Sequence, residues 1–228
     1  MRRDERNETS LRIIRAVLSR AKVPLKWGYA VFMRLIVGVD EVGRGPLAGP
    51  VSIGIVVCKK LLMMPELTDS KKMTEDARER VYELAVDRKK EGEIDFGVFS
   101  ASASVIDEIG IEDALRRIIA QGLRTLVPEA EKADVILDGR LSAPKEYRQQ
   151  TLIGGDLLVP AISLASVVAK VERDHYMVRI AEKYPAYGFE EHKGYGTARH
   201  IMAIQEKGPS AIHRMSFLKN ITGATMPA

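Results

Sequence analysis

The sequence predicts an α/β protein built on one mixed β-sheet with helices on its faces. Apolar, β-branched runs of strand length begin near residues 35, 51, 95 and 133. The segments between the second and third runs, and between the third and fourth, contain apolar residues at helical spacing. The first two runs are joined by a glycine-rich turn alone, which predicts a hairpin. Strands in part paired as a hairpin and in part separated by helices indicate a mixed sheet.

The first half of the chain supplies the hairpin, one helix and a third strand. The second run is continuously apolar, which is typical of a strand buried on both faces. Thr74 is a candidate N-cap for the helix that follows. The expected elements are strand 35–40, strand 51–58, helix 75–88 and strand 95–100.

The second half alternates helices with two further strands. Gly110 is expected to break a helical stretch in two, and small residues at the start of a long helix let it pack closely on a sheet. The expected elements are helices within 103–126, strand 133–138, a short strand and turn over 151–159, helix 161–183, a loop over 184–197 and helix 198–207.

Charge is unevenly distributed along the 228 residues. The formal net charge is +4, but residues 1–33 contain eight basic and three acidic residues. That segment therefore accounts for +5 and the remaining chain for −1. The main domain is not expected to attract polyanions at long range, so any nucleic-acid affinity must come from local clusters of basic residues.

Residues 1–33 are interpreted as a basic N-terminal extension, either helical or disordered. Leu11, Ile14 and Leu18 recur at helical spacing. A membrane-surface or nucleic-acid arm is one interpretation, and an extension without function is the preferred one. Met33 stands directly before the first strand and is an alternative start.

The composition predicts a soluble cytoplasmic protein. Cys58 is the single cysteine, which excludes an intrachain disulfide and is typical of a reducing compartment. The longest uncharged apolar run, residues 157–169, is too short to cross a membrane. No interaction with a membrane is expected.

Four acids are expected to converge on one site. Asp40 and Glu41 end the first strand, Asp138 ends the fourth, and Asp156 precedes the long helix. Crowded carboxylates repel one another unless a cation intervenes, and oxygen-rich sites suit Mg²⁺ or Mn²⁺. The zinc-binding patterns HExxH and CxxC are absent from the sequence. Two such ions can hydrolyse a phosphodiester, and this reaction is the predicted chemistry.

Two glycine-rich segments are candidate substrate contacts. Arg44 stands between Gly43 and Gly45, in a spacing that does not fit the dinucleotide pattern GxGxxG. Lys193 and Tyr195 stand among glycines further along, where a lysine can contact phosphate and a tyrosine a sugar or base. A surface loop with a packed tyrosine is the alternative, and His213 is at least as well explained as a buried structural histidine.

The chain resembles ribonuclease HII, the type 2 ribonuclease H of bacteria and archaea. The similarity runs from Ile36 to Phe217 and includes the ordered motifs GVDEVGRGPLAGPV, ILDG, GGD, AKVERD, HKGYGT and HRMSF. It implies an RNase H-like fold with a five-stranded mixed sheet and a small helical C-terminal region. It also divides the chain into the extension (1–33), a catalytic domain (34–183) and a C-terminal substrate-binding region (184–228).

The resemblance implies cleavage of RNA in RNA–DNA hybrids and incision at ribonucleotides embedded in duplex DNA, leaving a 3′-hydroxyl and a 5′-phosphate. It implies that Asp40, Glu41, Asp138 and Asp156 bind the metal ions, of which two are expected in the substrate complex. It also implies that the Gly43-Arg44-Gly45 backbone reads the ribose 2′-hydroxyl beside Tyr195.

Lys170 and Asp174 are four residues apart on the long helix and are expected to pair beside the site. The chain departs from the family pattern at Gly154, where lysine is common, and at Gly110, where asparagine is usual. Neither departure affects a carboxylate. The 33-residue extension is shorter than the folded N-terminal domain of type 3 enzymes, which favours type 2.

A DNA-only nuclease of the same fold and a hybrid-binding module without catalysis are the competing interpretations. The retained acids disfavour the second. A monomer is expected.

Overall fold

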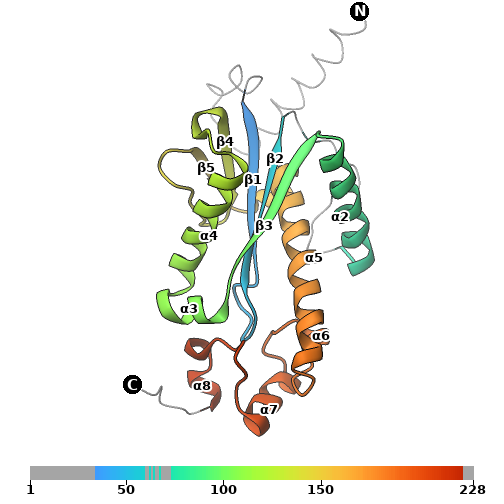
Figure 1. Ribbon diagram of the computed structural model, residues 1–228, viewed down its shortest axis with the longest axis vertical. Helices are drawn as coiled ribbons and strands as arrows, with labels where there is room; N and C mark the ends of the chain where they lie inside the picture. Colours follow the sequence, from blue (N-terminus) through green and yellow to red (C-terminus); the bar gives the residue numbers. More distant parts are fainter. Residues whose placement is uncertain (1–33, 60–61, 63, 65–66, 68–72, 223–228) are drawn as a thin grey trace, which may run out of the picture.

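The structure is a computed structural model that describes residues 34–59, 62, 64, 67 and 73–222. The expected extension, residues 1–33, lies outside the described residues. A single sheet forms the middle of the molecule and is covered by helices on both faces (Figure 1). The predicted fold class, a mixed sheet with a small helical C-terminal region, is confirmed.

β1 lies at the centre of the sheet. The strand order is β3-β2-β1-β4-β5, in which β1 pairs antiparallel with β2 and parallel with β4, while β2–β3 is antiparallel and β4–β5 parallel. The strands are β1 (Leu35–Val42), β2 (Val51–Cys58), β3 (Ile94–Ala101), β4 (Ala133–Asp138) and β5 (Arg148–Leu152). The predicted hairpin is β1–β2, and β2 is buried along its whole length, as its apolar run indicated.

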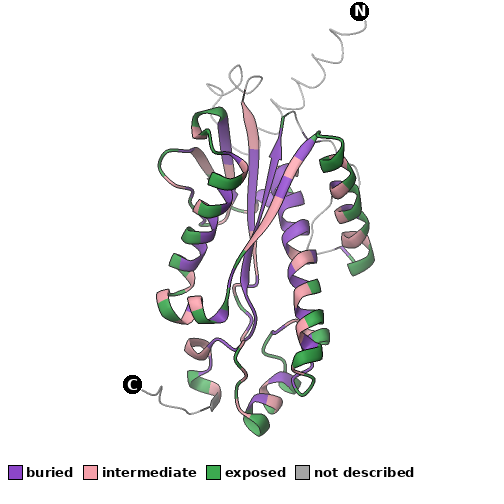
Figure 2. Ribbon diagram, viewed as in Figure 1, coloured by how far each residue is buried: buried purple, intermediate pink, exposed green. Residues whose placement is uncertain are grey.

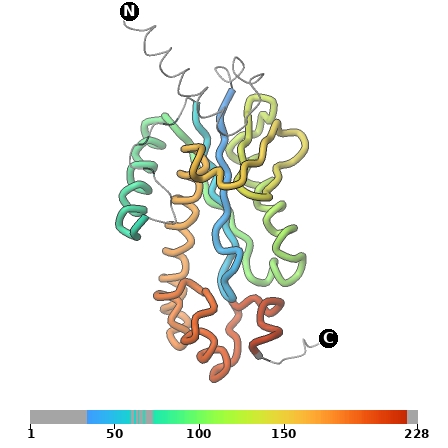
Figure 3. Tube along the Cα trace, turned by 180° about the vertical axis from the view of Figure 1, so that it is seen from behind, coloured from blue at the N-terminus to red at the C-terminus, as the bar shows by residue number. Residues whose placement is uncertain are grey.

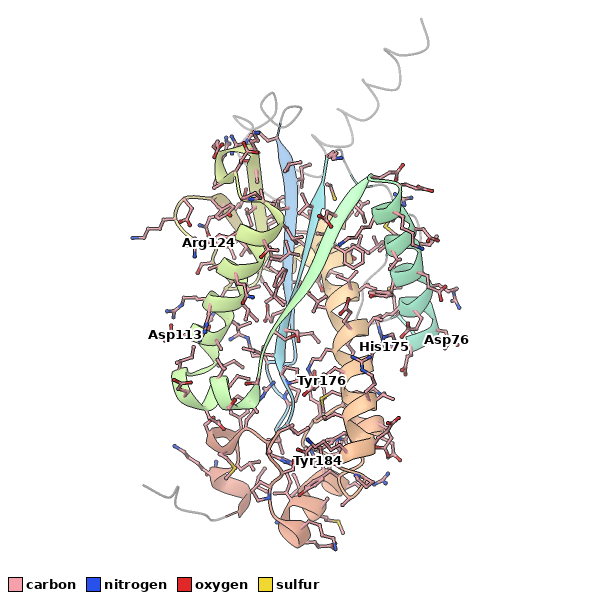
Figure 4. All side chains as sticks on the ribbon, viewed as in Figure 1. Asp76, Asp113, Arg124, His175, Tyr176 and Tyr184 are labelled. Atoms are coloured by element: carbon pink, nitrogen blue, oxygen red, sulfur yellow. The ribbon has the colours of Figure 1, made fainter. Side chains whose placement is uncertain are left out.

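Helices on the two faces of the sheet enclose separate apolar cores. One core lies between the sheet and α3–α4, and the other lies between the sheet and α2 and α5. Figure 2 shows the buried inner faces, and Figure 4 shows Asp113 and Arg124 of α4 pointing away from the sheet. The helices are α2 (Glu75–Lys90), α3 (Ala103–Ile109), α4 (Ile111–Leu126) and α5 (Pro160–Lys183), with a short 3₁₀ turn η3 (Ala130–Lys132).

Two local predictions are confirmed at the helix ends. The Thr74 hydroxyl accepts a hydrogen bond from the backbone N–H of Ala77 at 3.2 Å, so Thr74 is the N-cap of α2. Gly110 separates α3 from α4 with a φ of 79°, a conformation that favours glycine. Among the described helices, none is both long enough and apolar enough to span a membrane.

α5 rests directly on the sheet at two glycines. A Cβ atom added to Gly38 would lie 2.2 Å from the carbonyl carbon of Ala161, and one added to Gly54 would lie 2.1 Å from the carbonyl oxygen of Ala165. No side chain larger than hydrogen fits there. The close approach brings the next residues of α5, Ser166 and Lys170, to the carboxyl end of β1.

The fifth strand differs from the prediction. The sequence predicts a short strand and turn over 151–159, whereas β5 begins at Arg148 and ends at Leu152. β5 is an edge strand with the polar sequence RQQTL, so it lacks the apolar run by which the other strands were recognised. The turn that follows contains a 3₁₀ helix, η4 (Gly155–Leu157), which carries Asp156.

The C-terminal region lies against the β1–β2 turn. Figure 3 shows it from behind, directly below the end of β1. Its elements are α6 (Phe189–His192), α7 (Ala198–Lys207), η5 (Met215–Phe217) and α8 (Lys219–Thr222), and α6 interrupts the loop expected over 184–197. The backbones of the two regions are joined directly, because Leu47 N–H donates to Gly194 and Arg214 N–H donates to Leu47, each at 2.8 Å.

Candidate active site

Asp40 and Asp138 lie on neighbouring parallel strands. The last parallel pair between β1 and β4 is Val39 with Leu137, and each acid is the next residue of its strand. Asp40 is also paired across the hairpin with Gly54, on the sheet face that α5 covers. Since this face is closed by α5, the Asp40 carboxylate is held in a largely buried position, with 5% of the residue exposed.

Burial, with a smaller contribution from the neighbouring carboxylates of Glu41 and Asp138, raises the pKa of Asp40 to about 7. Two hydrogen bonds act in the opposite direction. The Ser166 hydroxyl bonds to the carboxylate, and the backbone N–H of Glu41 donates to Asp40 Oδ1 at 2.8 Å. The site therefore concentrates negative charge in a place where water cannot fully compensate it.

A cavity of about 400 Å³ lies at this end of the sheet. It brings together three of the four predicted acids, the glycine-rich loop, a tyrosine and two cations. Its lining consists of Asp40, Glu41, Val42, Gly43, Arg44, Gly45, Arg78, Asp138, Ser166, Lys170 and Tyr195.

Asp156 is the fourth predicted acid, and it does not line the cavity. It is buried on η4, with 4% of the residue exposed. The preceding residue, Gly155, donates its backbone N–H to Asp138 Oδ1 at 2.6 Å. Asp156 is thus linked to the cavity by its chain neighbour Gly155, which bonds the cavity residue Asp138.

Glu41 points to the opposite side of β1 from Asp40 and meets Arg44. Arg44 Nε lies 3.3 Å from Glu41 Oε1, and the same guanidinium forms an ion pair with Glu112 in the first turn of α4. Arg44 is about one-third exposed, so this ion-pair network is accessible to solvent. It joins the glycine-rich loop to α4 across the rim of the cavity.

The expected pair on α5 is present. Lys170 Nζ lies 2.8 Å from Asp174 Oδ1. Lys170 lines the cavity, and so does Arg78 of α2, whose Nη1 donates to the Met73 carbonyl at 2.6 Å. Two cationic groups therefore stand beside the acids, where they can contact phosphate oxygens.

The loop from Gly43 to Pro50 leaves three adjacent backbone donors without a partner. Pro46 and Pro50 have no N–H, while the N–H groups of residues 47–49 donate to carbonyls of Gly194 and Ile212. Within the described part of the chain, no acceptor bonds the N–H groups of residues 43–45. These residues line the cavity, so three donors are available to a ligand.

Tyr195 and Lys193 are placed differently. Tyr195 is 43% exposed and lines the cavity, 4.0 Å from the position of a Cβ atom at Gly45. Lys193 does not line it. Its ammonium group donates to the Glu190 carbonyl, and its φ of 51° makes it the left-handed residue that ends α6.

Buried histidines support the Tyr195 segment from behind. His200 Nδ1 donates to the Tyr195 carbonyl at 2.9 Å, so its Nε2 accepts, at 3.0 Å, from Nε2 of His213. His213 Nδ1 then accepts from the backbone N–H of Ser210 at 2.8 Å. This arrangement requires both rings to be neutral, and burial lowers the pKa of each to about 4. His213 is a buried structural histidine, as one sequence interpretation held.

The donor set fits a hard divalent cation. The cavity lining offers carboxylate and hydroxyl oxygens and contains neither histidine nor cysteine. Within the described residues, no three acidic, histidine or cysteine side chains form a compact ligand group, so the site is an open, acid-lined cavity. Mg²⁺ sites are commonly of this kind, because the ion keeps several waters and binds few carboxylates together with substrate phosphate.

Sequence reasoning did not single out four residues that shape the site. Ser166 and Arg78 carry no motif of their own. Arg173 and Arg214 stand inside the motifs AKVERD and HRMSF, which were noted for other residues, and each is almost fully buried. The buried positions of the two arginines could not be read from local pattern, because all but one of the carbonyls that they bond lie more than 120 residues away in sequence.

Comparison with known proteins identifies the family. The family model described as Ribonuclease HII matches residues 37–220. A ribonuclease HII of Caldicellulosiruptor bescii is 44% identical over 188 residues, which cover 82% of this chain and 88% of the relative. The residues matched by the family model include every residue that lines the cavity.

Two solved structures share the fold. The ribonuclease HII of Archaeoglobus fulgidus, solved in complex with PCNA, has a TM-score of 0.66 at 24% identity and covers 84% of this chain and 98% of its own. Bst-RNase HIII, solved in complex with Mn²⁺, has a TM-score of 0.59 at 15% identity and covers 82% of this chain and 68% of its own. Because the family model and the relative each match most of its sequence, the chain belongs to the ribonuclease HII family and is an enzyme of the nuclease class.

Proposed function

We propose that this protein is an endoribonuclease that hydrolyses the RNA strand of RNA–DNA hybrids and incises duplex DNA at embedded ribonucleotides. The reaction uses two divalent ions, Mg²⁺ or Mn²⁺, and leaves a 3′-hydroxyl and a 5′-phosphate. One observation carries the proposal. The same cavity contains the crowded carboxylates of Asp40, Glu41 and Asp138 and the three unpartnered backbone donors of residues 43–45.

Asp40, Glu41 and Asp138 hold the cations, and Asp156 is the fourth acid of the set. When bound, the ions supply an activated water and stabilise the leaving oxygen of the phosphodiester. Bst-RNase HIII, which shares the fold, was solved in complex with Mn²⁺, and this supports a divalent ion as the cofactor. A cation would also relieve the repulsion between the Asp40 carboxylate and its two acidic neighbours.

The free N–H groups of the Gly43-Arg44-Gly45 segment read the ribose. The 2′-hydroxyl is the group that distinguishes a ribonucleotide from a deoxyribonucleotide, and its oxygen can accept a hydrogen bond from a backbone amide. Gly45 is exposed and carries no side chain, so the backbone can approach the sugar closely. Recognition is therefore placed next to the acids in both sequence and space.

The remaining groups position the nucleic acid. Tyr195 packs against the sugar, and Lys170 and Arg78 contact phosphates beside the scissile bond. Lys193 is a further phosphate contact, which requires its ammonium group to leave the Glu190 carbonyl. Lys170 also holds Asp174, and this pair keeps the ammonium group over the cavity.

The division of labour follows the elements. We assign catalysis to residues 34–183 and part of substrate binding to residues 184–228, which supply Tyr195. The protein acts as a cytoplasmic monomer on RNA–DNA hybrids and ribonucleotide-containing duplex DNA.

A cleavage assay tests the function. An end-labelled duplex carrying one ribonucleotide should be cut in the presence of Mg²⁺ or Mn²⁺, and the same duplex made wholly of DNA should stay intact. Asp138→Asn should abolish cleavage and retain duplex binding. Asp134→Asn is the control on the same strand, because Asp134 is a buried acid at the other end of β4, paired with Arg34 and Arg148.

The two comparisons separate the parts of the proposal. Cleavage of the all-DNA duplex at a similar rate would replace the ribonuclease by a DNA nuclease. Normal cleavage by Asp138→Asn would refute the assignment of the acids. An equal loss of cleavage in the Asp134→Asn control would show that the substitutions act by disrupting β4 rather than by removing the Asp138 carboxylate.

A further inference from the structure

Arg214 binds the carbonyl side of the same segment whose N–H groups face the cavity. Its Nη2 donates to the Gly43 carbonyl at 2.6 Å, its Nη1 to the Arg44 carbonyl at 3.0 Å, and its Nε to the Gly49 carbonyl at 3.0 Å. One planar guanidinium therefore fixes both ends of the loop. The contacts join residues about 170 positions apart in sequence.

This arginine is buried without a carboxylate partner. It is fully buried, and no acid of the described residues lies within ion-pair distance of it. Asp107 is the acid whose charge it feels, but that carboxylate accepts the backbone N–H groups of Met215 and Ser216. Burying a charge against carbonyls alone is costly, so a role beyond packing is indicated.

The geometry of the peptide bond connects the two sides of the loop. In a trans peptide the C=O of one residue and the N–H of the next point in opposite directions. Cis peptides are absent from the described residues. With the Gly43 and Arg44 carbonyls turned toward Arg214 in the interior, the N–H groups of Arg44 and Gly45 point away from it, to the side of the cavity that these residues line.

We infer that Arg214 is a positioning residue for ribose recognition: by holding the carbonyls of Gly43 and Arg44, it presents the N–H groups of Arg44 and Gly45 to the 2′-hydroxyl. This inference rests on the proposed function. Glycine makes such support necessary, because Gly43 and Gly45 leave both peptide planes free to rotate. Loss of the guanidinium group should reduce selectivity for the ribonucleotide and leave the acidic side chains in place, because Arg214 contacts none of them.

Arg173 provides a matched comparison. It is also almost fully buried, and it donates to the carbonyls of Pro50, Ala48 and Lys193. Its side chain also packs beside Gly43, but its bonds hold the distal half of the loop and the C-terminal region, and none goes to the carbonyl of Gly43 or Arg44. Replacing either arginine by lysine should destabilise the fold to a similar degree, but Arg214→Lys alone releases the two peptide planes.

The test measures ribose selectivity by binding. Fluorescence anisotropy in a chelating buffer, where cleavage cannot proceed, gives Kd for a labelled DNA duplex with one ribonucleotide and for the same duplex without it. The Kd for the all-DNA duplex divided by the Kd for the duplex with one ribonucleotide reports the contact with the 2′-hydroxyl. Arg214→Lys should lower this ratio at least about fivefold, the equivalent of one hydrogen bond, and leave affinity for the all-DNA duplex unchanged. Arg173→Lys should keep the wild-type ratio.

The outcomes separate this inference from the proposed function. If the wild-type protein shows no preference for the ribonucleotide, the proposed function fails. If the wild type prefers it and Arg214→Lys keeps that preference, or both arginine variants lose it equally, the positioning role is wrong.

A milder variant covers a folding failure of Arg214→Lys. Asp107→Asn weakens the anchor of residues 215–216, so it should reduce the ratio partially while the protein stays folded. An unchanged ratio in that variant, together with an unfolded Arg214→Lys, overturns the inference.

Discussion

The close contact between Gly38 and α5 positions Ser166 beside Asp40, and Gly38→Ala tests how much the site depends on it. The added Cβ would lie 2.2 Å from the carbonyl carbon of Ala161 and 2.5 Å from the nitrogen of Ile162. Ordinary contact begins at 3.4 Å, so the helix backbone would have to retreat by about 1.2 Å. Both obstacles are backbone atoms, which cannot move aside as a flexible side chain can.

Overpacking of this kind costs about 1 to 3 kcal/mol, and the collision with backbone places Gly38→Ala at the upper end of that range. The smaller conformational entropy of the unfolded chain returns about 0.4 to 1 kcal/mol. A net loss of about 2 to 2.6 kcal/mol lowers Tm by about 4 to 10 °C for a domain of this size. Activity should fall as well, because a displaced α5 moves Ser166 away from Asp40.

Thermal unfolding followed by circular dichroism, together with the cleavage assay at a temperature where both proteins are folded, measures the two effects. Gly97→Ala is the control, since its nearest neighbours are ring atoms of Phe99 at 3.1 and 3.4 Å, which can turn aside. Its stability should change by less than about 1 kcal/mol. A Gly38→Ala protein with wild-type Tm and wild-type activity would show that α5 does not set the geometry of the site.

Two further predictions concern protons and metal. The pKa of His200 and of His213 is about 4 in the folded protein and about 6.5 when unfolded, so the free energy of unfolding should fall as pH drops from about 6.5 toward 4, by at most about 1.4 kcal/mol per pH unit for each ring. Urea unfolding measures this slope, and a His213→Gln protein with the wild-type slope would contradict it. Mg²⁺ or Mn²⁺ at about 100 times its Kd should stabilise the wild type by about 2.7 kcal/mol in a thermal-shift experiment. Asp40→Asn should lose that increase while being at least as stable as wild type in chelator, because a buried, repelled charge is removed; an equal increase in both proteins would refute the role of Asp40.

The strands that carry the acids could be predicted because their sequences obey a local rule. Apolar β-branched residues form β1 and β4, and a carboxylate that directly follows such a run lies at the end of a strand, at the edge of the sheet. The proximity of Asp40 to Asp138 then follows from parallel pairing of two neighbouring strands. β5 escaped prediction because an edge strand needs no continuous apolar run, and its polar residues resemble a loop.

The arginines could not be predicted because hydropathy assigns them to the surface. Arg173 and Arg214 are buried by bonds to carbonyls that only the tertiary fold brings together. Nothing in the spacing of HRMSF indicates that its arginine lies beneath a loop 170 residues earlier. The placement of Lys193 follows the same logic, because its left-handed conformation and its bond to Glu190 depend on how α6 ends.

The contacts between the C-terminal region and the β1–β2 loop give this region a structural role in addition to substrate binding. A substrate-binding appendage would contact nucleic acid through its outer surface and could be removed without altering the catalytic domain. Here residues 194, 212 and 214 instead take up backbone groups of the loop between β1 and β2, from the side opposite the cavity. Without them the Gly43 and Arg44 carbonyls would turn to solvent, and the adjacent N–H groups would lose their common direction. The C-terminal region therefore supports the loop between β1 and β2 as well as supplying Tyr195, and the proposed ribose selectivity would depend on Arg214, which does not contact the substrate.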